Sequence, residues 1–88
     1  MHETALVRDL VRQMIELARA TGARRVTRAK LWLGALSHLS AVHFRAHFAA
    51  EARDTIAAAA VLEIEVSDNP DDPDAQHIRL VSIDIDDE

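Results

Sequence analysis

The sequence RVTRAKLWLG, at residues 25–34, alternates side chains with the period of two that is typical of a β-strand. One face of such a strand carries the aliphatic side chains Ala29, Leu31 and Leu33. The opposite face carries Arg28, Lys30 and Trp32. The pattern therefore predicts a strand at 25–33 with one face toward a hydrophobic core. Gly34 predicts a bend or a bulge at its end.

A helix is predicted on each side of this strand. Before it, apolar residues recur every three or four positions, as in an amphipathic helix at about 4–21: Leu6, Val7, Leu10, Val11, Met14, Ile15 and Ala18. Gly22 is suited to end that helix in a left-handed conformation. After the strand, Ser37 or Ser40 could cap a second helix at about 40–54. The alanine run at 57–60 fits either a tight connection or a frayed extension of this helix.

Two more strands are predicted, at 61–66 and 77–85. The alternation of the last strand slips between Leu80 and Val81, as a β-bulge would cause. Between these strands, residues 67–76 contain two prolines, an asparagine and four acids, which is the composition of a loop. We therefore expect an α+β fold in the order α-β-α-β-β. Two helices would pack on one face of a small three-stranded sheet, and the last two strands would pair as a hairpin.

The composition predicts one folded domain spanning residues 1–88. The chain is 49% hydrophobic and 28% charged, as in globular proteins. A chain of this length buries only roughly 60% of its unfolded surface, so a homodimer would be a natural way to bury more. It has no apolar run of the ~20 residues that span a bilayer and no signal-peptide pattern. We therefore expect a cytoplasmic protein without a membrane partner.

Charge is divided unevenly along the chain. Residues 1–62 hold nine basic and five acidic residues, whereas residues 63–88 hold one basic and ten acidic residues, which gives a formal net charge of −5. This potential repels phosphate backbones, so no nucleic-acid partner is expected. The acidic end would suit a basic partner, although such tails often serve solubility alone.

The first three residues, Met1, His2 and Glu3, can chelate a metal ion. The free α-amine, the His2 amide and imidazole nitrogens, and the Glu3 amide offer four nitrogens in one plane, a geometry that Ni(II) and Cu(II) favour over Zn(II). Methionine removal needs a small second residue, so Met1 is expected to remain. The alternative is an exposed His2 with no metal role.

The chain resembles the nickel-insertion metallochaperones of hydrogenase and urease maturation, the HypA/HybF family. The resemblance rests on the opening Met1-His2-Glu3 with its helix, on 22–26 leading into 31–37, on 44–55 and 62–65, and on the closing strand 78–85. It implies a transient Ni(II) ion held by Met1, His2 and Glu3. It also implies delivery to the large subunit of a nickel–iron hydrogenase or its precursor, together with a maturation GTPase. The implied role is metal transfer and not enzymatic turnover.

One family feature is missing. Members normally carry two Cys-x-x-Cys pairs between the last two strands, where they hold a structural zinc. Here residues 67–76 stand in that place and the chain has no cysteine, so no zinc is expected. The alternative function is therefore a metal-free docking or scaffold subunit that binds a hydrogenase or its assembly partners.

Two further groups of residues are candidates for binding. His43 and His47 lie four residues apart on the second helix and could form a secondary metal site, although a solvated face with a His47–Glu51 pair explains them equally. Trp32, with Arg28 and Lys30 on the same strand face, could contact a protein partner or a second copy. The alternative is that its ring lies over the stems of Arg28 and Lys30. No nucleophile elbow and no phosphate-binding glycine loop is present, so no catalytic residues are predicted.

Overall fold

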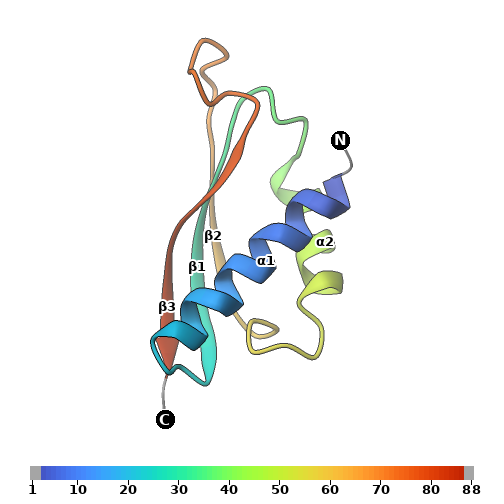
Figure 1. Ribbon diagram of the computed structural model, residues 1–88. Coiled ribbons are helices and arrows are strands. Elements are labelled where there is room, and N and C mark those ends of the chain that lie inside the picture. Colours follow the sequence, from blue (N-terminus) through green and yellow to red (C-terminus); the bar gives the residue numbers. More distant parts are fainter. Residues whose placement is uncertain (1–2, 87–88) are drawn as a thin grey trace.

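A computed structural model describes residues 3–86 of the chain. The elements follow the predicted order α-β-α-β-β: α1 (Glu3–Ala20), β1 (Arg25–Leu33), α2 (Ala41–Glu51), β2 (Val61–Val66) and β3 (Ile78–Asp86). Both helices lie on the same face of the sheet, with α1 crossing the strands diagonally (Figure 1). The predicted α+β class and its single helical layer are thus confirmed.

The helix α1 forms because its apolar stripe supplies one wall of the core. Val7, Met14 and Ala18 are fully buried, while the charged side chains between them are exposed. The helix ends in the predicted glycine motif. Gly22 has φ of 76°, its N–H donates to the Arg19 carbonyl, and the Ala23 N–H donates to the Ala18 carbonyl at 2.9 Å. These two bonds satisfy carbonyls that the end of a helix leaves open.

The helix α2 is shorter than expected. Ser40 is its N-cap, and the Ser40 hydroxyl accepts from the His43 N–H at 3.2 Å. Phe44 and Phe48 pack into the core with their rings stacked, 6.3 Å between centroids. The helix stops at Glu51 instead of 54, because Asp54 takes a left-handed conformation with φ of 63°. The alanine run 57–60 is a series of turns and not a helical extension.

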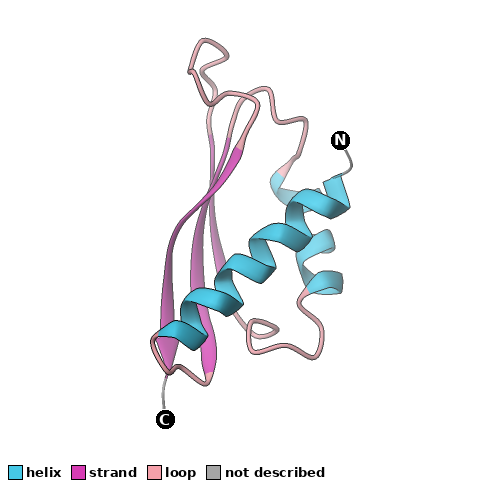
Figure 2. Cartoon of the chain, in the orientation of Figure 1, coloured by secondary structure: helices cyan, strands magenta, loops and turns pink. Residues whose placement is uncertain are grey.

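The expected hairpin between the last two strands is wrong. The strand order is β2-β1-β3, so β1 lies in the centre, parallel to β2 and antiparallel to β3 (Figure 2). The physical reason is burial. The strand β1 is the most buried, with Ala29, Leu31 and Leu33 wholly inaccessible, and the central position also satisfies both of its hydrogen-bonding edges. The helix α2 then acts as the crossover connection to the parallel strand β2.

The predicted bulge in β3 is present at the predicted residue. Lys30 is aligned with Ser82, whereas the next residue, Leu31, is aligned with Leu80. Val81 is therefore the extra residue on β3. A second irregularity lies near the start of β1, between Val26 and Arg28.

The loop 67–77 passes over the end of β1 to bring β3 to the opposite side of the sheet. The Gly34 N–H donates to the His77 carbonyl at 2.9 Å, and the Leu36 N–H donates to the Ala75 carbonyl at 2.7 Å. Gly34 lies so close to this loop that a Cβ atom there would collide with the Ala75 carbonyl. The glycine is therefore required by the close approach of two backbones.

Candidate metal site

Of the predicted metal ligands Met1, His2 and Glu3, only Glu3 belongs to the described part of the chain. Met1 and His2 fall outside the described residues, and Glu3 is the first residue of the helix. The first four amides of a helix have no carbonyl acceptor within the helix. The Glu3 backbone nitrogen is thus not committed to the helical hydrogen-bond ladder, and it can serve as a ligand without breaking that ladder.

The first turns of α1 are held firmly on the rest of the molecule. Val7 is fully buried, four residues after Glu3. On the outer side of the helix, Arg8 Nε donates to Glu51 Oε2 at 3.2 Å and Arg8 Nη2 donates to Glu51 Oε1 at 3.4 Å. This two-point contact raises the pKa of the Arg8 guanidinium and ties α1 to the end of α2. The start of α1, to which Glu3 belongs, is therefore anchored to the rest of the fold.

The second predicted metal group, His43 and His47, lies on α2. The structure places His43 in an exposed position and His47 in a half-buried one. Glu51, which continues this helical stripe, accepts hydrogen bonds from Arg8. Among the side chains that the structure describes, no group of three His, Cys, Asp or Glu residues comes close enough to hold a metal ion. A secondary metal site at His43 and His47 stays a prediction, and it would need further ligands from outside the described side chains.

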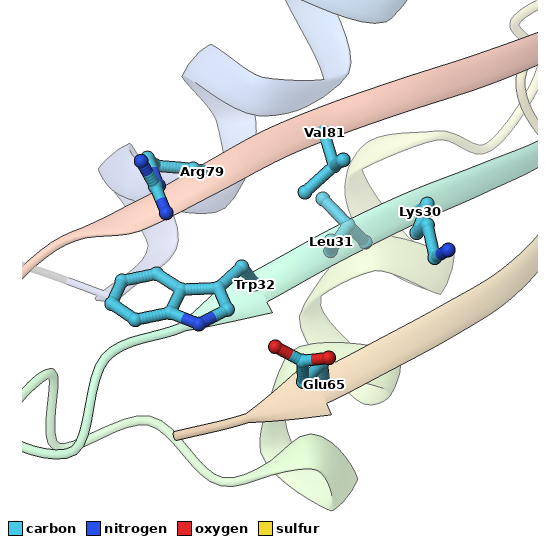
Figure 3. A pocket seen from close by; sticks show the side chains of 6 residues that line it. All are labelled: Lys30, Leu31, Trp32, Glu65, Arg79 and Val81. Carbon is cyan, nitrogen blue, oxygen red and sulfur yellow. The ribbon is translucent and has the colours of Figure 1, made fainter. Parts of the chain in front are cut away.

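Trp32 lies on the face of the sheet opposite α1 and α2, together with Arg28 and Lys30 as the alternation predicts. Only 8% of it is exposed, because Arg79 of β3 lies over the ring with its guanidinium carbon 4.6 Å from the ring centroid. Figure 3 shows the indole between Arg79 and Glu65, its neighbours on the two flanking strands. They border a hollow of about 240 Å³ that Lys30 and Val81 complete.

Arg79 is the residue that sequence reasoning missed at this position. The guanidinium that covers Trp32 comes from another strand and not from Arg28 or Lys30. Arg79 also lies 3.5 Å from Asp74, which links the loop to the sheet. The alternation in β3 places Arg79 on the same face as Trp32, but only the strand order brings the two together. The role of Trp32, Arg28 and Lys30 in partner binding stays a prediction.

The acidic loop organises itself through its own polar side chains. Asn69 Oδ1 accepts from the Asp71 N–H at 3.0 Å, and Asp72 Oδ1 accepts from the Asp74 N–H at 2.8 Å. Ala75 is 3% exposed. The carboxylate and amide oxygens of the loop thus accept hydrogen bonds that stabilise its turns, and the loop has no cysteine thiolate.

The chain is similar to known proteins in sequence and in fold. Residues 1–70 match the family described as hydrogenase/urease nickel incorporation, metallochaperone, hypA. No curated protein matches the chain at a significant level. The solution structure of the Ni metallochaperone HypA from Helicobacter pylori is 19% identical over 100% of both chains, with a TM-score of 0.82. A second solution structure of a HypA protein is 20% identical over 100% of this chain and 98% of that one, with a TM-score of 0.75. At these identities the two structures establish a shared fold.

The described part of the chain has two helices, α1 and α2. Neither of the two in the described part of the chain is long and apolar enough to cross a bilayer.

Proposed function

Because this chain belongs to the HypA family of metallochaperones for nickel incorporation into hydrogenase and urease, we propose that it binds Ni(II) through Met1, His2 and Glu3. The observation that carries the proposal is the family match, which starts at residue 1 and so includes all three residues. The start of α1 at Glu3 supports it, since the helix leaves the Glu3 amide without an internal partner.

Electrostatics favour this ligand set at a helix start. The N-terminus of a helix carries roughly half a positive charge, which opposes a bound cation. Deprotonation of the His2 and Glu3 amides supplies two negative charges, so a nickel ion with both amidates is formally neutral. The positive end of the helix dipole therefore repels this neutral complex only weakly. The nickel is cargo, and it is bound transiently and passed on.

We propose a nickel–iron hydrogenase large subunit or its precursor as the recipient, with a maturation GTPase as the second partner. The chain would act in the cytoplasm as a single domain, would transfer metal without catalysing a reaction, and would hold no zinc. The support for the last point is the donor set of residues 67–76, which offers oxygens where a closed zinc site needs four good ligands.

Nickel binding is expected to release protons and to weaken steeply as the pH falls. At pH 7 the α-amine, with an ordinary pKa of about 7.7–8.0, and the two amides are all protonated before binding. Up to three protons therefore leave, and the affinity should drop by about a hundredfold or more per pH unit in acid solution. Calorimetry of untagged protein in buffers of different ionisation enthalpy measures the proton count. Release of no proton would contradict the amide ligands.

The docking alternative has a separate test. It is favoured by the replacement of the zinc lobe with the loop 67–77, which packs onto Gly34 and Leu36. If the chain is a metal-free scaffold, a His2→Ala variant should capture the hydrogenase large subunit as efficiently as the wild type. If nickel delivery is its function, that variant should still bind the subunit but fail to raise the nickel content of the subunit in a transfer assay.

A further inference from the structure

The strand β3 presents an unpaired edge. In the described sheet, β2 and β3 are the outer strands, and β3 is the longer at nine residues. Proteins usually protect such edges with proline, with charged side chains and above all lysine, with β-bulges or with very short strands. The sequence of β3 contains neither proline nor lysine, and Val81 and Ile85 are 57% and 39% exposed. Its protection consists of the bulge at Val81 and the charges of Arg79 and Asp84, so a strand that pairs with this edge must match both.

The directions of the backbone groups in β3 follow from hydrogen bonds at its two ends. The Gly34 N–H donates to the His77 carbonyl, and the Arg24 N–H donates to the Asp86 carbonyl, so both of these carbonyls face β1. Backbone groups alternate in direction along a strand. We follow this alternation inward from His77 and from Asp86. Four residues then have N–H and C=O groups that point toward the free edge: Ile78, Leu80, Ile83 and Ile85.

The bulge gives the residue pattern along this edge an approximate two-fold symmetry. Because Val81 is an extra residue, the helix-facing side chains of β3 are Ile78 and Leu80 before it and Ile83 and Ile85 after it. The other face carries Arg79 before the bulge and Asp84 after it. The strand thus has an approximate two-fold symmetry about a point between Val81 and Ser82. Apolar residues correspond to apolar residues, and the cation Arg79 corresponds to the anion Asp84.

We propose that β3 pairs antiparallel with β3 of a second copy of this chain, about a two-fold axis between Val81 and Ser82. Leu80 would then lie opposite the partner's Ile83, and Ile78 opposite the partner's Ile85, in pairs whose backbone groups both face the new interface. Arg79 would lie opposite the partner's Asp84 in a non-hydrogen-bonded pair, where side chains approach most closely. The result is a six-stranded sheet with all four helices on one face.

Charge complementarity supports this occupant and this register. The side chains of Arg79 and Asp84 are 55% and 65% exposed. Within residues 3–86, their contacts to acids or bases are long, 3.5 Å from Arg79 to Asp74 and 3.9 Å from Asp84 to Arg28. An antiparallel dimer contains the pair twice. A shift of the register by one residue would place apolar side chains opposite charged ones.

The other edge of the sheet is unsuited to the same pairing. In β2, Glu63 and Glu65 share one face. Suppose that Val61–Val66 pairs antiparallel with the same strand of a second copy, with equivalent faces on the same side. These carboxylates then lie opposite those of the partner, directly or on the diagonal. Like charges opposite one another destabilise a sheet. The two edges therefore differ in chemistry, and β2 provides an internal control.

Sedimentation equilibrium with charge-exchanged variants tests the register. Arg79→Glu and Asp84→Lys should each weaken dimerisation by about tenfold or more, because each creates two like-charge contacts. The double variant restores opposite charges and should dimerise within about threefold of the wild type. A wild-type chain that is monomeric at millimolar concentration, or a double variant weaker than both single ones, would overturn the proposal.

Disulfide trapping tests the same edge without altering its charges. The chain has no cysteine, so a Val81→Cys variant has one thiol, next to the proposed axis and within the Cα separation of up to about 6.8 Å that a disulfide allows. Val61→Cys on β2 is the matched control, since Val61 and Val81 are 59% and 57% exposed. The Val81→Cys chain should form covalent dimers about ten times faster. Equal rates for the two variants would exclude this interface.

Discussion

Replacing His2 with alanine is expected to abolish nickel binding at the amino terminus. The change removes the imidazole ligand and the six-membered chelate ring that it forms with its own amide. Loss of a residue that merely supports a metal ligand costs about 10–100-fold in affinity. Loss of the ligand itself should therefore cost at least about a hundredfold, or about 2.8 kcal/mol. Calorimetry of Ni(II) binding to untagged protein measures the effect.

His43→Ala is the matched control for this change. His43 is exposed on α2 and its side chain lies outside the proposed ligand set, so this variant should bind nickel as the wild type does. Acetylation of the α-amine should reproduce the effect of His2→Ala, since it removes another of the four nitrogens. Equal nickel binding by the wild type and His2→Ala would exclude the proposed ligands. A weakening by His43→Ala alone would place the metal on α2.

Replacing Gly34 with alanine is expected to destabilise the fold far more than the same change at Gly22. The new Cβ would collide with the backbone carbonyls of Ala75 and Asp74, and backbone cannot move aside as a flexible side chain can. The Gly34–His77 and Leu36–Ala75 hydrogen bonds would stretch or break. We expect a loss of about 3 kcal/mol, from overpacking and weakened hydrogen bonds together.

Thermal unfolding measures this loss, which corresponds to a fall in Tm of about 4–8 °C per kcal/mol in a domain of this size. Gly22→Ala is the control, because a Cβ at Gly22 meets no atom within 4 Å and only its φ of 76° opposes the change. That variant should lose about 1 kcal/mol, the usual cost of a left-handed alanine. If the two variants unfold at the same temperature, the loop does not press on the end of β1 as described.

The local elements of this protein could be predicted because each has a short-range cause. The alternation of residues 25–33 sets β1, the spacing of Val7 and Met14 sets the buried face of α1, and Gly22 ends that helix. Even the bulge at Val81 is visible as a slip in the alternation. The proposed ligands Met1, His2 and Glu3 come from their chemistry and the family resemblance, and they stay a prediction.

The relations between these elements could not be predicted in the same way. Nothing in the local pattern of β3 says whether it pairs with β2 or β1, so the expected hairpin was wrong and the contact of Arg79 with Trp32 was missed. The pairing of Arg8 with Glu51 has the same origin, since these residues meet only after two helices have packed.

The amino-acid sequence alone determined the elements, their order and the chemistry available to a metal ion, because side-chain periodicity and ligand type act over a few residues. The tertiary structure alone decided that β1 is central, that the loop 67–77 closes over Gly34, and that β3 is an outer strand of the described sheet. The physical reason is that strand partners are chosen by the burial of the whole sheet. That free energy is shared among residues distant in the chain, so no local pattern encodes it.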